Sequence, residues 1–240
     1  RWLGRCMDSV KAWCDANQFE YQFIDDSLFN YLDPALMQTL KQQKVIATDI
    51  ARLYAIQDGL KQFDRVLWLD ADFLIFAPDD FLLPDQAQMP EGYMLGREVW
   101  VQASAERPNK LKANVKVHNA FLLFDRRNSF LDFYLEHAER LVNKCEGPMP
   151  PQFVGPKLLT ALHNTVVCPV LETAGMLSPL VIDDLLADNG QCCALNLMTK
   201  RSPHPIAAAN LCHSLSSQNN RSEQEMLRLV EELLSRNMPL

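Results

Sequence analysis

An apolar run that ends abruptly in two aspartates constrains the fold of this 240-residue chain most strongly. Residues 66–69 are continuously apolar, which is typical of a strand buried on both faces in a parallel sheet. The run stops at Asp70-Ala71-Asp72, and residues 73–76 predict a second strand. Because ligands of open α/β sheets bind beyond the carboxyl ends of strands, the two aspartates are candidate ligand-binding groups. A turn that carries two solvated aspartates is the alternative.

The rest of the chain alternates between helical and extended patterns, which predicts an α/β fold with helices on both faces of a mostly parallel central sheet. We expect one domain over residues 1–240 with three α/β/α layers. Thr48 is predicted to cap the second helix, and the polar residues 102–116 are expected to form a surface loop. The expected helices cover residues 2–16, 45–60, 130–141, 156–163 and 222–236, and the further strands cover 20–25, 93–97, 119–124 and 166–170.

Composition excludes several classes of protein. The chain is 48% apolar and 22% charged, as in an ordinary globular protein, and its net charge of −7 argues against general nucleic-acid binding. No apolar run reaches the length of a membrane span. The seven cysteines form no CxxC pattern, which favours reduced thiols and a cytoplasmic location, with work at a membrane surface left open.

The two neighbouring carboxylates of Asp70 and Asp72 indicate a cation site. Such groups repel each other unless a cation joins them. Oxygen ligands favour Mg²⁺ or Mn²⁺, which typically take substrate phosphates as further ligands. The sequence therefore predicts metal-dependent chemistry on a phosphorylated substrate.

Two segments carry a resemblance to a known superfamily. The segment "FDRVLWLDADFLIF" resembles the Asp-x-Asp segment of retaining glycosyltransferases with the GT-A fold, and its residues are most similar to those of the glycogenin-like family 8. Upstream, "ATDIARLYAI" resembles a helix of the family 32 and clostridial-toxin-type sugar transferases. Thr48, Asp49 and Arg52 match that helix, and Trp68 takes the place of the usual Tyr. The Gly-Gly that family 32 has before its strand is missing.

Three later segments extend the resemblance. "HNAFLLF" places Asn119 at the Asn of a family strand, and "VGPKLLTAL" matches a "TGPxLLT" segment through Gly155 and Pro156. "NLCHSLSS" places His213 at the position of a late family His, although the Trp expected after it is absent. In these families a strand precedes the first helix, so the resemblance implies that this N-terminal strand is lacking from the 240 residues.

The resemblance implies a metal-dependent hexosyltransferase, which moves a sugar with retention from a UDP- or GDP-sugar to a saccharide, lipid-linked or protein acceptor. It implies that Asp49 contacts sugar hydroxyls and that Arg52 contacts the sugar-phosphate region. The implied residues are Asp49, Arg52 and Asp72 for catalysis; Asp49, Arg52, Trp68, Asp70, Asn119, Gly155 and Pro156 for donor binding; and Asp70, Asp72 and His213 for Mn²⁺ or Mg²⁺.

Structural interpretations of the same residues stay open. Asp49 and Arg52 share a helix face, so they could form an ordinary ion pair. Asn119 could be satisfied by backbone, and Gly155-Pro156 could simply begin a helix. Two other functions also remain: a phosphatase of the haloacid-dehalogenase type, for which Asp183-Asp184 would supply the acidic pair, and a non-catalytic module that binds nucleotide sugars or carbohydrate.

Overall fold

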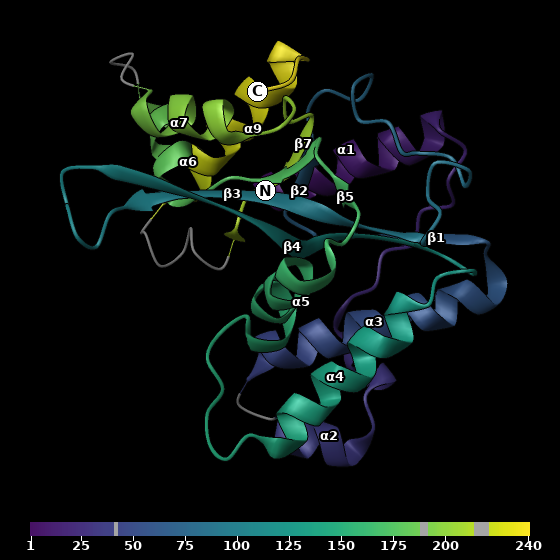
Figure 1. Ribbon diagram of the computed structural model, residues 1–240. Helices are drawn as coiled ribbons and strands as arrows, with labels where there is room; N and C mark the ends of the chain where they lie inside the picture. The colour runs from purple at the N-terminus through teal and green to yellow at the C-terminus, as the bar shows by residue number, and fades with distance from the viewer. Residues whose placement is uncertain (41–42, 188–191, 214–220) are drawn as a thin grey trace.

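The computed structural model describes residues 1–40, 43–187, 192–213 and 221–240. Helices and strands alternate along the chain, as Figure 1 shows. The helices are α1 (Trp2–Ala16), η1 (Asp26–Tyr31), α2 (Pro34–Thr39), α3 (Lys44–Gln62), α4 (Phe130–Lys144), η2 (Phe153–Lys157), α5 (Leu158–Val166), α6 (Pro179–Leu186), α7 (Cys193–Arg201) and α9 (Glu223–Arg236). The strands are β1 (Arg65–Leu69), β2 (Phe73–Ile75), β3 (Tyr93–Ala103), β4 (Leu111–Asp125), β5 (Val170–Leu171), β6 (Ala174–Met176) and β7 (Ala208–Asn210).

The strands form two mixed sheets, so the expectation of a mostly parallel sheet is not met. One sheet has the order β1-β4-β3-β5 and the other has the order β2-β7-β6. The pairs β1·β4, β3·β4 and β2·β7 are antiparallel, whereas β3·β5 and β6·β7 are parallel. The apolar run of β1 belongs to a strand that pairs with β4 in antiparallel register, from Arg65 opposite Asp125 to Leu69 opposite Phe121.

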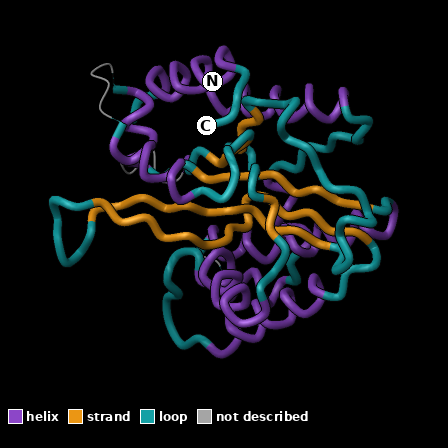
Figure 2. Tube along the Cα trace, turned by 45° about the horizontal axis from the view of Figure 1, so that its top comes forward, coloured by secondary structure: helices purple, strands orange, loops and turns teal. Residues whose placement is uncertain are grey.

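Helices cover the strands from both sides, as the sequence predicts (Figures 1 and 2). On one side, α1, α6, α7 and α9 bury an apolar core that includes Trp2, Trp13 and Phe73. On the other side, α3, α4 and α5 bury a second core that includes Ile50 and Tyr134. No helix of the described residues combines the length and the apolar character that crossing a bilayer requires.

Several helices begin and end where their sequence patterns predict. Helix α1 matches its predicted bounds, and α9 begins with a capping box in which Ser222 and Glu225 bond each other's backbone N–H groups. Asn128 accepts a hydrogen bond from the backbone N–H of Leu131 at the start of α4. Helix α3 differs, because it begins four residues before Thr48, whose hydroxyl donates to the Lys44 carbonyl inside the helix instead of capping it.

The predictions for two segments are wrong: one was expected to be a strand and the other a loop. The structure has no strand at residues 20–25, although this segment is not helical either. Residues 102–116, expected as a surface loop, belong largely to a long hairpin, because β3 runs to Ala103 and β4 starts at Leu111. The hairpin projects beyond the remaining strands at one side of Figure 1, where polar residues on both faces hide the alternation that normally marks a strand.

A bulge in β4 shapes the centre of the molecule. Leu95 of β3 lies opposite Leu122 of β4, but the next residue, Gly96, lies opposite His118. Residues 119–121 of β4 therefore have no counterparts in β3. Bulges of this kind bend a strand and re-aim its side chains, often next to functional sites.

The bulge depends on close packing between Gly96 and His118. The His118 ring is fully buried; its Nε2 lies 3.2 Å from the Ala174 carbonyl oxygen, and its Nδ1 accepts a hydrogen bond from the Ala120 N–H at 3.2 Å. Burial lowers the pKa of His118 to about 4, so the ring is neutral at pH 7. A Cβ atom at position 96 would overlap this ring.

We predict that Gly96→Ala destabilises the protein by about 1–3 kcal/mol, because the added methyl group meets a packed ring that has no room to move. The control is Gly4→Ala in α1, where nothing lies within 4 Å of the added Cβ and where alanine should raise stability by up to about 1 kcal/mol. Urea unfolding of both variants measures the difference. Equal effects of the two substitutions would contradict the packing described here.

Candidate functional site

A cavity of about 800 Å³ runs along β1 and ends at the Asp-x-Asp segment. Its sides come from α1, α3 and the segment at residues 18–24. Its length is lined mainly by apolar side chains, whereas Thr48, Arg52, Asp70, Asp72 and His213 gather at one end. The cavity is therefore amphipathic: one group of polar and charged side chains lies where β1 ends, and Glu20, Lys44, Asp64 and Arg65 also line it.

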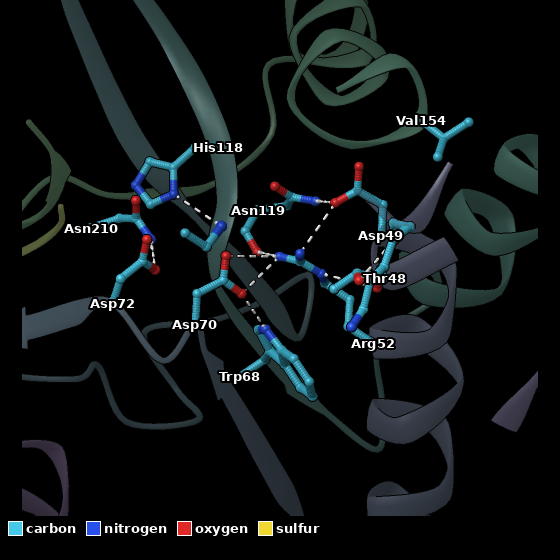
Figure 3. Close-up of polar contacts among 12 residues, drawn as sticks. Thr48, Asp49, Arg52, Trp68, Asp70, Asp72, His118, Asn119, Val154 and Asn210 are labelled. Carbon is cyan, nitrogen blue, oxygen red and sulfur yellow. Dashed lines mark hydrogen bonds and ion pairs between the residues drawn. The ribbon is translucent and has the colours of Figure 1, made fainter. Parts of the chain in front are cut away.

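Arg52 of α3 is the hub of this charged end (Figure 3). Its Nη1 lies 3.0 Å from Asp70 Oδ1, and its Nη2 lies 3.2 Å from Asp49 Oδ1. Nη1 also donates a hydrogen bond of 2.7 Å to the backbone carbonyl of Asn119. Burial lowers the pKa of Arg52, but the charges of Asp70 and Asp49 outweigh it and leave that pKa raised. The guanidinium thus joins α3, β4 and the turn after β1 as a permanent cation.

Trp68 orients this cluster from β1. Its indole N–H donates to Asp70 Oδ1 at 2.8 Å, and its ring centroid lies 5.7 Å from the Arg52 guanidinium carbon. That distance is within the range of a cation–π interaction. Because Trp68 and Arg52 bind the same carboxylate from two directions, the Asp70 side chain has little freedom.

Asp49 lies behind Arg52 in a buried position. Its Oδ1 accepts a hydrogen bond of 2.8 Å from the Asn119 side-chain amide, while its Oδ2 is buried and has no hydrogen-bond partner among the described residues. Burial raises the pKa of Asp49, against the opposing effects of Arg52 and Asn119. A Cβ at Gly155 would lie 2.6 Å from that Oδ2 and 2.7 Å from Asn119 Nδ2. Only glycine lets the backbone approach this pair so closely.

Asp72 lies on the other side of Asp70 and is held by neutral donors. The Asn210 amide donates to its Oδ1 at 2.6 Å, and the backbone N–H of His213 donates to its Oδ2 at 2.7 Å. Burial and the nearby charge of Asp70 raise the pKa of Asp72. The carboxylates of Asp70 and Asp72 therefore repel each other, and a bound cation would relieve that repulsion.

The oxygen ligands at this end of the cavity suit a divalent cation in part. Asp70 and Asp72 share the end of the cavity, and each carboxylate keeps lone pairs beyond those used by its present partners. No cluster of three or more His, Cys, Asp or Glu side chains suited to a metal occurs in the described residues, so Asp70, Asp72 and His213 are not a preassembled triad. The residues fit a cation that takes its remaining ligands from water and substrate, as Mg²⁺ and Mn²⁺ do.

The predicted site residues separate into two groups. Arg52, Trp68, Asp70, Asp72 and His213 line the cavity. The remaining predicted residues, which are Asp49, Asn119, Gly155 and Pro156, are buried and are not among the lining residues.

The structure also adds residues that the sequence did not single out. Asn210 of β7 holds Asp72, and His118 anchors the bulge that presents Asn119. The contact between Asn210 and Asp72 joins residues 138 positions apart in the sequence, so no local pattern predicts it.

Comparisons with known proteins do not assign a family. No family profile matches the chain, and no curated protein matches it. Among solved structures, one similar chain comes from the crystal structure of a glycosyltransferase involved in the glycosylation of the major capsid of PBCV-1. It is 13% identical, with 96% of this chain and 92% of that chain covered and a TM-score of 0.45. A likeness of this size carries no functional assignment, which therefore depends on the site itself.

We predict that Arg52→Met costs about 3 kcal/mol or more of unfolding free energy, because it leaves two carboxylates without their shared cation. The matched control is Arg5→Met, also on a helix, whose pair with Glu231 has side chains 45% and 51% exposed. Solvent and salt screen that exposed pair, so its loss should cost much less than the loss of Arg52. Chemical denaturation compares the two variants, and similar losses for both would argue against Arg52 as the hub.

Proposed function

We propose that this protein is a glycosyltransferase that moves a sugar from a nucleoside diphosphate sugar to an acceptor. The observation that carries the proposal is the charged end of the cavity, where the Arg52 guanidinium and the Asp70–Asp72 pair lie side by side. This arrangement combines a fixed cation with a carboxylate pair that can hold a divalent ion. Both suit a diphosphate leaving group, which gains negative charge as the glycosidic bond breaks.

Arg52 has the first role in the proposed mechanism. It stays protonated and is fixed by Asp49, Asp70 and the Asn119 carbonyl, so it needs no rearrangement to meet developing charge. Preorganised charge in a partly dry site is worth more than the same charge in water. We propose that Arg52 stabilises the departing diphosphate.

Asp70 and Asp72 would hold Mn²⁺ or Mg²⁺, with His213 as the candidate third ligand that the family resemblance implies. When bound, such an ion acts as a Lewis acid for the phosphate oxygens. The Asn210 amide and the His213 N–H keep the Asp72 carboxylate in place before anything binds. Trp68 does the same for Asp70.

Asp49 and Asn119 have a positioning role toward the sugar in this proposal. Asp49 Oδ2 is an acceptor without a described partner, and a buried acceptor of this kind costs free energy until a donor reaches it. A sugar hydroxyl is such a donor, and it would reach this oxygen if η2, with Gly155 and Pro156, shifts on binding. Retention of anomeric configuration and a UDP- or GDP-sugar donor belong to this proposal, as do a saccharide, lipid-linked or protein acceptor and a cytoplasmic location.

A phosphatase would need Asp183 and Asp184 as a second acidic pair near Asp70, but both have other partners. Asp184 accepts hydrogen bonds from the backbone N–H groups of Ala194 and Leu195 at the start of α7, at 2.6 and 2.9 Å. Asp183 pairs with Arg221 at 2.5 Å. Both carboxylates hold local structure, and neither is among the residues that line the cavity at Asp70.

The test is nucleoside diphosphate release by the full protein from a panel of UDP- and GDP-sugars with Mn²⁺. We expect release from one donor, abolished by EDTA and reduced at least about 100-fold in Asp72→Ala, because the leaving group loses its electrostatic stabilisation. Asp79→Ala is the control, since Asp79 is exposed and lies outside the cavity lining. Melting temperatures confirm that the variants fold.

Two results would contradict this function. Donor release that is unchanged in Asp72→Ala would remove the aspartate pair from the mechanism. Tight donor binding without turnover, in folded protein, would instead favour a non-catalytic nucleotide-sugar module.

A further inference from the structure

One face of the hairpin formed by β3 and β4 carries a row of polar side chains and one tryptophan. The strand register pairs Glu98 with Lys116, Trp100 with Asn114, and Gln102 with Lys112. Because alternate residues of a strand share a face, these three pairs lie in one row that runs outward along the hairpin. The ion pair between Lys116 Nζ and Glu98 Oε1, at 3.7 Å, shows that the innermost pair lies on one side.

The opposite face of the hairpin packs against helices. Val99 and Val101 are buried in the core to which α1, α6, α7 and α9 contribute. Helices α6 and α7 lie over this part of the hairpin in Figure 1. In the row itself, Trp100 is only half-buried, and Gln102 and Lys112 are exposed. The row therefore reaches solvent on the face that α6 and α7 leave uncovered.

The inner end of this row lies beside the carboxylate pair. Trp100 packs against a small cluster that includes Cys212. The next residue is His213, whose backbone N–H donates to Asp72 Oδ2 at 2.7 Å. The Cys212 N–H donates to Asn210 Oδ1 at 2.8 Å, and the amide of the same Asn210 donates to Asp72. Cys212 thus links the Trp100 ring to both groups that hold Asp72.

The row and Arg52 lie on opposite sides of the carboxylate pair (Figure 3). Arg52 contacts Asp70 from one side. The His118 ring, which lies opposite Gly96 at the inner end of the hairpin, is on the other side together with Asp72. In the proposed function the diphosphate of the donor meets Arg52. The side on which the row begins is then left for the second substrate, the acceptor.

Trp100 has the chemistry of a platform for a sugar ring. The indole N–H groups of Trp13 and Trp68 donate to acceptors within the protein, whereas the N–H of Trp100 has no partner among the described residues. A half-buried indole of this kind offers an apolar face to the C–H groups of a sugar and a donor to one of its hydroxyls. Glu98 and Asn114 beside it supply further acceptors and donors.

We propose that this row binds an oligosaccharide acceptor, with one sugar ring stacked on Trp100. From Glu98 to Gln102 the strand spans about 13 Å, which is longer than one sugar ring, so the row suits a chain of sugars. The row contains no aliphatic side chain, which argues against a lipid chain in this place. The inference rests on the proposed function and selects the class of acceptor within it.

The test titrates di- to pentasaccharides of the malto, cello, chito and manno series into the full protein without donor, with calorimetry as the readout. We expect one series to bind, and its affinity to rise at least about tenfold from the disaccharide to the pentasaccharide, because only longer chains reach Gln102. Trp100→Ala should lower that affinity at least about tenfold, and Trp100→Tyr less, because tyrosine keeps a ring. Phe133→Ala is the control, since Phe133 is an exposed aromatic residue on α4, outside the row.

Several results would overturn the proposal. One is the absence of binding in all four series, and another is an equal loss in Trp100→Ala and Phe133→Ala. If melting temperatures show that Trp100→Ala does not fold, the double variant Gln102→Ala/Lys112→Ala replaces it, since both residues are exposed. It should weaken the pentasaccharide and not the disaccharide, and an unchanged pentasaccharide affinity would contradict the proposal.

This test separates the inference from the proposed function, because binding needs neither donor nor turnover. Oligosaccharide binding without any release of nucleoside diphosphate would contradict the transferase function and leave the row as a saccharide site. Sugar transfer with an unchanged acceptor KM in Trp100→Ala would contradict the row and leave the transferase function in place.

Discussion

The centre of this molecule depends on the ion pairs and the hydrogen bond that the Arg52 guanidinium makes. It binds Asp49 on its own helix, Asp70 after β1 and the Asn119 carbonyl of β4. A buried carboxylate without a counterion is costly, so each of these contacts holds the others in place. Helix α3 is thereby fixed against the strand whose end forms the charged part of the cavity. The same contact that stabilises the fold also places a cation beside Asp70, the first carboxylate of the pair.

Close backbone approach sets the geometry around this hub. Gly96 makes room for the buried His118 ring, and the bulge that follows His118 carries Asn119 to Asp49. Gly155 lets the start of η2 close over the same Asp49 carboxylate. The site is therefore assembled from segments that are distant in the sequence, and two glycines provide the space that side chains would fill.

Sequence patterns predict the local elements well and the pairing poorly. The apolar run before Asp70 and the amphipathic α1 and α9 are visible locally, because each buries a face set by its own residues. The direction in which a strand pairs is not visible locally, because the same apolar run occurs in parallel and in antiparallel sheets. Contacts such as Asn210 with Asp72 also leave no local pattern. Residues 20–25 match a strand pattern, yet they form no strand in the structure, because the pattern does not show whether a pairing partner is available.

The most direct test of the central claim is calorimetric titration of UDP and GDP into the full protein, with and without Mn²⁺. The account predicts that one nucleotide binds with Mn²⁺, and that affinity falls at least about tenfold without the ion or in Asp72→Asn, since the carboxylate pair would hold the ion that the diphosphate meets. Affinity that is unchanged by Mn²⁺ and by Asp72→Asn would contradict the account, because the charged end of the cavity would then play no part in recognising the diphosphate.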